Sequence, residues 1–151
     1  MIRYWEFTDA LESEYHLHRK QVMERFDLSA VEVDVMLFLA NNPQYKTAAD
    51  VSRMKKIPKS HVSLAVKGLI QKRMLRGEPD AGNRKRIRLV LTQEAAEMIT
   101  YGRQQQEHFV NVLFRGFSPE EAEQYHSYCA RIMNNVHNNQ KEEQSKHVQR
   151  E

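Results

Sequence analysis

Residues 47–92 carry the most specific pattern in this sequence. They read TAADVSRMKKIPKSHVSLAVKGLIQKRMLRGEPDAGNRKRIRLVLT. Thr47 has the side chain of a helix cap, and Pro58 suits the first position of a second helix, where its missing N–H needs no partner. Apolar residues recur along the second helix at helical spacing; these are Val62, Ala65, Val66, Leu69 and Ile70. This half of the segment predicts a helix-turn-helix, with Val51 and Met54 of the first helix pointing inward.

The other half of the segment predicts a β-hairpin. Residues 78–83 form a cluster of turn-forming residue types. After them, Ile87, Leu89 and Leu91 alternate with other residues at the period of a strand. We expect residues 74–77 to pair with that strand, and Thr92 to cap the next helix. A helix-turn-helix followed by such a hairpin, or wing, is a winged helix.

Positive charge is concentrated in the same region. Residues 53–88 contain twelve Lys and Arg side chains and only two acidic ones, which gives a net charge of +10. The whole chain carries +3, so the remaining residues sum to −7. A basic segment of this kind is typical of a protein that binds a polyanion, most often nucleic acid. The alternative is a solvated charged face without a ligand.

Two groups of side chains are candidates for contacting DNA. The major groove, about 12 Å wide, admits one helix that presents hydrogen-bond donors and small polar groups. The second helix offers five such residues opposite its apolar stripe: Lys59, Ser60, His61, Ser63 and Lys67. The hairpin tip offers Arg84, Lys85 and Arg86, which can reach the minor groove or flanking phosphates.

Helices are predicted on both sides of the winged helix. Residues 3–26 have apolar and aromatic residues at helical spacing, and Ser29 with Glu32 is a capping box that starts the next helix. A long helix is expected over 93–115. Ser118 with Glu121 starts another helix, and the polar residues from Asn138 onward are expected to be disordered. The predicted fold class is therefore mainly α with a small β-hairpin (α+β).

The segment resembles the MarR family of bacterial winged-helix transcriptional regulators. The resemblance covers roughly residues 5–138 and is clearest over 51–70 and at Leu91-Thr92. Two positions differ from the family: the wing has Asn83 and Lys85 where an Asp-x-Arg is usual, and Arg73 replaces a common Gly.

The resemblance implies a homodimer that binds a pseudopalindromic operator as a repressor and is released by a small-molecule effector. It divides the chain into an N-terminal dimerisation helix (1–28), a DNA-binding domain (29–92), C-terminal dimerisation helices (93–138) and a polar tail (139–151). Tyr15, His18, Met36 and Phe109 are candidate linings of an effector pocket, but ordinary core or interface positions are the favoured interpretation for each of them.

Other functions have weaker support in the sequence. Seven histidines invite a metal site, yet His126 with Cys129, or His16 with His18, supply too few ligands, so we expect no metal and no cofactor. We expect Cys129 to be a small buried residue and not a redox sensor. No phosphate-binding glycine loop or catalytic motif indicates an enzyme. A cytoplasmic protein without membrane contact is expected, and the alternative function is a winged-helix module that binds an acidic protein.

Overall fold

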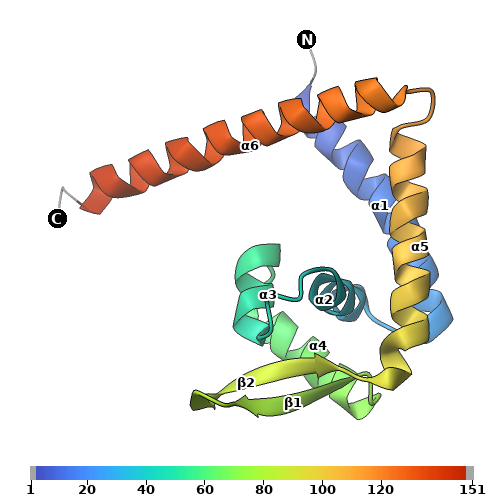
Figure 1. The fold of residues 1–151 in the computed structure, drawn as a ribbon, viewed down its shortest axis with the longest axis vertical. Coiled ribbons are helices and arrows are strands. Elements are labelled where there is room, and N and C mark those ends of the chain that lie inside the picture. The colour runs from blue at the N-terminus through green and yellow to red at the C-terminus, as the bar shows by residue number, and fades with distance from the viewer. Residues whose placement is uncertain (1–2, 149–151) are drawn as a thin grey trace. The chain divides into compact units, whose positions relative to one another are not determined.

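A computed structural model describes residues 3–148 of the chain. The elements follow one another as α1 (Tyr4–Phe26), α2 (Ala30–Asn41), α3 (Ala48–Lys55), α4 (Lys59–Gln71), β1 (Leu75–Asp80), β2 (Asn83–Leu91), the short 3-10 helix η1 (Gln93–Ala95), α5 (Ala96–Leu113) and α6 (Pro119–Val148) (Figure 1). The predicted fold class, mainly α with a small β-hairpin, is confirmed. The chain divides into two compact units, Met1–Val110 and Asn111–Glu151.

Local capping fixes where several helices begin. The Ser29 hydroxyl accepts from the Glu32 N–H while the Glu32 carboxylate accepts from the Ser29 N–H, at 3.2 and 2.8 Å. Thr47 and Asp50 form the same reciprocal pair before α3. The two helix starts predicted at these positions are confirmed. Pro58 is the N-cap of α4, one position before the predicted one.

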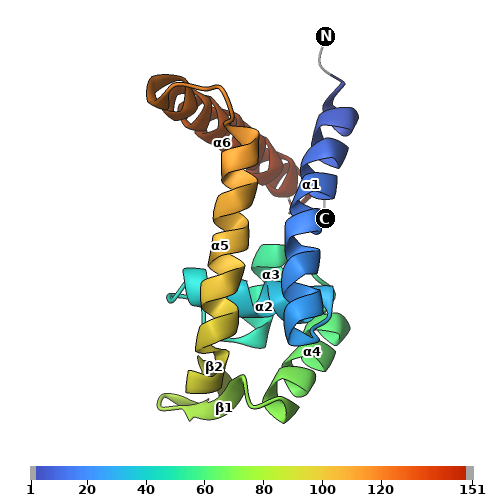
Figure 2. The ribbon, with the colours of Figure 1, turned by 90° about the vertical axis from the view of Figure 1, so that its right-hand side faces the viewer.

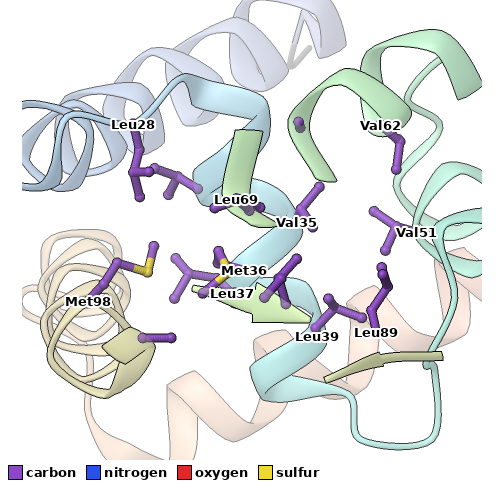
Figure 3. Packing of buried hydrophobic residues seen from close by; sticks show 14 of the residues in the cluster. Leu28, Val35, Met36, Leu37, Leu39, Val51, Val62, Leu69, Leu89 and Met98 are labelled. Carbon is purple, nitrogen blue, oxygen red and sulfur yellow. The ribbon is translucent and has the colours of Figure 1, made fainter. Parts of the chain in front are cut away.

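Helix α2 runs through the middle of the core of the first unit. Val33, Val35 and Met36 have no exposed surface, and Leu37 and Leu39 are buried beside them. Figure 3 shows these side chains meeting residues of α3, α4, β2 and α5 on different sides of α2. Because apolar residues surround most of this helix, several elements can pack on it at once.

Helices α1 and α5 pack side by side and antiparallel in the first unit (Figure 2). Phe26 lies against Tyr101, with ring centroids 5.9 Å apart, and Tyr15 lies against Phe109 at 5.3 Å. The residue that comes earlier in α1 contacts the residue that comes later in α5, so the two helices run antiparallel. α5 also approaches α2 closely, because a Cβ on Gly102 would lie 2.6 Å from a methyl carbon of Leu37.

The hairpin is longer than the sequence predicts. β1 continues to Asp80 and β2 starts at Asn83, so only two residues form the turn. Pro79 is accommodated because β1 is an edge strand, and an irregularity in the register follows it. The Leu89 N–H donates to the Lys46 carbonyl at 2.7 Å, which fastens the segment before α3 to the free edge of β2.

The α4–β1 junction is a left-handed turn at Arg73. Its φ is +60°, and the Arg73 and Met74 N–H groups donate to the carbonyls of Ile70 and Leu69. These two bonds define a Schellman motif, in which glycine usually occupies the left-handed position. The resemblance predicts a glycine where this chain has Arg73, and the left-handed conformation is the physical reason that glycine would suit the position.

Three local expectations are corrected by the structure. Met54 is 45% exposed and does not point inward. The Thr92 hydroxyl does not cap η1 and donates instead to the Arg73 carbonyl. Helix α6 continues to Val148, past the expected start of disorder, because its Lys, Glu and Gln residues favour helix even without burial. The end of the predicted tail, residues 149–151, lies outside the described residues.

Within residues 3–148, no helix combines the length and the apolar composition that crossing a membrane requires.

Candidate nucleic-acid interface

Helix α4 is oriented by its apolar stripe. Val62, Ala65 and Leu69 are buried in the core that α2 organises. Their burial turns the opposite side of α4 outward, because residues three and four apart share one face of a helix. All five residues predicted to face DNA from this helix are exposed: Lys59, Ser60, His61, Ser63 and Lys67.

The first turn of α4 has a positive electrostatic character. It begins at Lys59 directly after Pro58, and its first turn contains no acidic residue. The unpaired N–H groups at a helix start attract anions, and the Lys59 ammonium adds to that attraction. The start of α4 can therefore bind a phosphate as well as present side chains.

The hairpin tip presents the second predicted group. Arg84, Lys85 and Arg86 are all exposed. The Asn83 side-chain oxygen accepts from the Lys85 N–H at 3.0 Å, which orders the start of β2. Figure 2 shows α4 and the hairpin at the same end of the first unit.

Ion pairs divide the basic residues of this region into two classes. Four are held by nearby carboxylates: Arg53 by Asp50 at 3.1 Å, Lys72 by Glu32 at 3.0 Å, and both Arg76 and Arg88 by Glu78 at 2.8 and 2.6 Å. The charges of these four residues are therefore largely neutralised by contacts within the protein.

The predicted contact residues belong mostly to the other class. Within residues 3–148, no carboxylate oxygen lies within 4.0 Å of a charged nitrogen of Lys59, Lys67, Arg84 or Lys85. Arg86 is intermediate, with Asp50 and Asp80 both at 3.9 Å. Lys55, Lys56 and Arg73 likewise have no carboxylate within 4.0 Å among the described residues. The charges that remain available to a polyanion therefore include those on α4 and at the hairpin tip.

A hollow of about 650 Å³ lies between the start of α3 and the hairpin. Lys85 and Arg86 line it from β2, and Arg53 lines it from α3. Sequence reasoning counted Arg53 in the basic segment without assigning it a role. The sequence spacing could have indicated the position of Arg53. It lies three residues after Asp50, so the two side chains share one face of α3 and the guanidinium can reach the capping-box carboxylate at the start of the helix. His61 lines a different hollow, which it shares with α2.

Asp50 organises the edge of this hollow. Burial raises the pKa of its carboxyl, but hydrogen bonds from the Lys46 N–H and from Thr47, together with the Arg53 charge, outweigh burial and lower the pKa below 3.8. The carboxylate therefore stays ionised at neutral pH. It faces both Arg53 and Arg86.

The four candidate effector residues do not all lie together. Tyr15 and His18 both lie against the Phe109 ring, with centroids 5.3 and 6.1 Å away. Met36 has no exposed surface and belongs to the core. Tyr15 also lines a small hollow of about 120 Å³ with Asp34 of α2.

The candidate metal ligands are not arranged as a site. Among the described side chains, no three His, Cys, Asp or Glu residues are grouped to hold an ion. His126 lies against the Phe114 ring at 5.0 Å, within the second unit. Cys129 is half-buried and shares a hydrogen bond with the Tyr125 hydroxyl, which together with burial raises the Tyr125 pKa.

A family comparison supports the winged-helix pattern found in the sequence. Residues 26–86 match the model of the MarR family. The match covers 61 of the 151 residues, and over them the chain is similar to the MarR family. The matched segment contains α2, α3, α4 and β1 entirely and the tip of β2. It therefore includes all eight predicted contact residues. No curated protein matches the chain.

Several solved structures share the fold of most of the chain. The S. aureus MepR–DNA complex superposes with a TM-score of 0.73 at 17% identity, over 89% of this chain and 96% of that one. A crystal structure of MarR superposes with a TM-score of 0.75 at 17% identity, over 93% of this chain and 95% of that one. A MarR-family regulator from Silicibacter pomeroyi superposes with a TM-score of 0.73 at 17% identity, over 89% of this chain and 90% of that one. At these identities the likeness establishes the fold.

Proposed function

We propose that this chain is a sequence-specific DNA-binding transcriptional regulator that acts in the cytoplasm. The observation that carries the proposal is the uncompensated positive charge on α4 and the hairpin tip, at one end of the first unit (Figure 2). Phosphate neutralisation is the main source of protein–DNA affinity, so such charges are what a DNA-binding surface requires. The likeness to MepR, whose structure is a DNA complex, supports the same conclusion.

In this proposal α4 reads the major groove. Ser60, His61 and Ser63 offer hydroxyl and imidazole groups to base edges, while Lys59 and Lys67 position the helix on phosphates. Leu64 adds an apolar contact that sequence reasoning did not assign: its side chain is 72% exposed on the same side of the helix. An apolar group in the major groove fits a thymine methyl.

The wing engages DNA beside the major-groove contact. Arg84 and Lys85 project from the tip without ion-pair partners among the described residues, and Arg86 lies behind them near Asp50. Arginine gains from the strong negative potential of a narrow minor groove. Arg53 lines the same hollow as Lys85 and Arg86, so a phosphate located there would face three cations and the Asp50 carboxylate.

The regulator acts as a homodimer in this proposal. Apolar and aromatic side chains of α1 are uncovered, with Tyr4 79% and Trp5 67% exposed. In α6, Ile132 and Met133 are 60% and 57% exposed. Exposed apolar side chains on α1 and, separately, on α6 indicate protein interfaces, and two-fold symmetry would present two α4 helices to half-sites about 34–36 Å apart.

Repression relieved by a small molecule is the regulatory mode that we infer. The hollow beside Tyr15 and Asp34 lies between α1 and α2, so a ligand bound there contacts both the helix assigned to dimerisation and the core helix. A ligand that binds one spacing of the two α4 helices better than another would shift the equilibrium between them. This hollow is the candidate effector site.

The test is a gel-shift titration with the DNA upstream of the protein's own coding region. We expect a discrete complex that survives excess random-sequence competitor and weakens steeply with salt. Binding that random DNA competes away equally well would contradict sequence specificity. Absence of DNA binding, together with capture of an acidic protein, would favour the protein-interaction alternative.

A further inference from the structure

We infer that Lys72 is a positioning residue for DNA reading, because its ammonium fixes the end of α4 against α1 and α2. The inference rests on the proposed function, since it concerns the helix assigned to the major groove. Lys72 is the C-cap of α4, at the opposite end of the helix from Lys59. It is not one of the eight residues predicted to contact DNA, and its role is to hold the helix that carries five of them.

The Lys72 ammonium joins three helices at one point. Its Nζ donates to the Asp27 carbonyl at 2.6 Å and to Glu32 Oε2 at 3.0 Å. Asp27 is the C-cap of α1, and Glu32 lies in the first turn of α2. These partners are 45 and 40 residues away from Lys72 in the sequence, so both bonds are tertiary contacts. The end of α4 is therefore fastened to the helix assigned to dimerisation and to the central helix of the core.

Three sources of negative potential surround this ammonium. The carbonyl ends of α1 and α4 carry partial negative charge, and Lys72 lies at both of them. The Glu32 carboxylate adds a full negative charge, and only 7% of this residue is exposed. Removing the ammonium leaves that carboxylate buried with less compensation, which is costly, whereas an exposed pair would contribute little. The contact therefore favours one arrangement of the three helices.

The same carboxylate limits how closely α4 approaches α2. A Cβ on Gly68 would overlap Glu32 Oε1, so the residue of α4 at this position has no side chain. Glu32 Oε2 also accepts from the Ser29 N–H at 2.8 Å, and this capping bond fixes the carboxylate at the start of α2. One oxygen thus lies against Gly68 while the other binds Lys72. A fixed charged contact positions the last turns of α4.

A shift at this end of α4 would move the base-reading end as well. The helix has 13 residues and is about 20 Å long, and it moves as a rigid rod. A recognition site must be held within about 0.5 Å of its productive geometry, because hydrogen bonds weaken steeply with distance and angle. Contacts to phosphates carry no sequence information and tolerate displacement better. Loss of the Lys72 contact should therefore reduce the preference for the operator more than the affinity for DNA in general.

Fluorescence anisotropy of the full chain on operator and on random-sequence DNA, across a salt series, tests this role. Lys72→Met keeps the length of the side chain and removes its charge. We expect it to weaken operator binding about tenfold, roughly the cost of one lost base contact, and random-DNA binding by less than about twofold, with the salt slope unchanged. Lys67→Met, on the exposed side of α4, is the matched comparison and should weaken both DNAs alike and reduce the slope by about one. If Lys72→Met behaves like Lys67→Met, or like wild type, the inference is wrong.

Glu32→Gln separates positioning from a loss of stability. A glutamine at this position still accepts from the Ser29 N–H, so the capping box is kept while the charge that meets Lys72 is removed. Glu32→Gln, and its combination with Lys72→Met, should each lower the operator preference about as much as Lys72→Met alone, because the two residues act as one pair. Additive effects of the two substitutions would contradict the inference.

The orientation of α4 in the free protein gives a readout that needs no DNA. Residual dipolar couplings of the backbone N–H groups in α4, compared with those in α2, report the angle between the two helices. We expect Lys72→Met and Glu32→Gln to change this angle, whereas Lys67→Met leaves it as in wild type. An unchanged angle in both variants would overturn the inference even if the protein binds DNA. A wild type that binds no DNA would contradict the proposed function, and the angle would still decide whether Lys72 positions α4.

Discussion

The Thr92 hydroxyl donates a hydrogen bond of 2.6 Å to the Arg73 carbonyl. The Thr92 N–H also donates to the Met74 carbonyl, at 3.2 Å. Thr92 therefore closes the open end of the hairpin by binding both residues of the turn that follows α4. This contact holds Arg73 in its left-handed conformation, at +60°.

Replacing Arg73 with glycine should stabilise the protein. A left-handed conformation costs an L-residue about 1–2 kcal/mol, and glycine avoids this cost. Glycine also loses more conformational entropy on folding, which offsets roughly half of the stabilisation. We expect Arg73→Gly to raise the free energy of unfolding by about 0.5–1 kcal/mol in urea titrations. Arg84→Gly, in a strand with ordinary φ, serves as the control and should be destabilising. Equal effects of the two substitutions would contradict this account.

Gly68 should not tolerate a side chain. A Cβ at this position would overlap Glu32 Oε1, and the Glu32 carboxylate is buried in the capping box with Ser29. We expect Gly68→Ala to lower the free energy of unfolding by about 1–3 kcal/mol, measured by thermal or urea denaturation. Gly82→Ala is the matched control, because a Cβ at Gly82 would meet nothing within 4 Å and the change in stability should stay within about 0.5 kcal/mol.

Acid should remove the stabilising contribution of Asp50. Hydrogen bonding outweighs burial and lowers its pKa below 3.8, so its contribution is present at neutral pH and is lost as the pH falls through the lower folded-state value. Asp50→Asn should therefore be less stable than wild type at neutral pH, by about 1–2 kcal/mol, the usual worth of a cap. In urea titrations this difference should shrink as the pH falls below the ordinary pKa of an aspartate and through the lower pKa of Asp50. Asp9→Asn, exposed on α1, is the control. A difference that is constant with pH would refute the assignment.

The wing arginines should contribute charge and not sequence preference. We expect Arg84→Ala with Arg86→Ala to weaken DNA binding on every sequence and to reduce the slope of log K against log salt by about 1–2, because each arginine that neutralises a phosphate adds roughly one to that slope. Fluorescence anisotropy across a salt series gives the slope. Lys20→Ala, on α1 beside Glu24, is the control for total charge. Wild-type binding by the double variant at all salt concentrations would show that the wing does not contact DNA.

A charge on the apolar side of α6 should disrupt the proposed dimer. Ile132 is 60% exposed in the described chain, and a buried interface position does not accept an unpaired carboxylate. We expect Ile132→Glu to weaken self-association by at least about tenfold, measured by light scattering across a dilution series. Asn134→Glu introduces the same charge on the opposite side of the helix and should leave the dimer intact. A monomeric wild type would contradict the dimer itself.

Local chemistry made most of the fold predictable from the sequence. The starts of α2 and α3 follow from Ser29 and Thr47, whose side chains bond to groups three residues away. The outward side of α4 follows from the period of its apolar residues. These signals act within one or two turns of chain, so they need no knowledge of the tertiary structure.

The sequence could not predict which charges stay available, because that is decided by contacts between residues far apart in the chain. Glu32 meets Lys72 forty residues away, and Glu78 meets Arg88 across the hairpin. Composition alone counts all twelve basic residues alike, because it does not contain these distances. Only packing determines which cations are already neutralised by carboxylates, and therefore which ones remain available on α4 and at the wing tip.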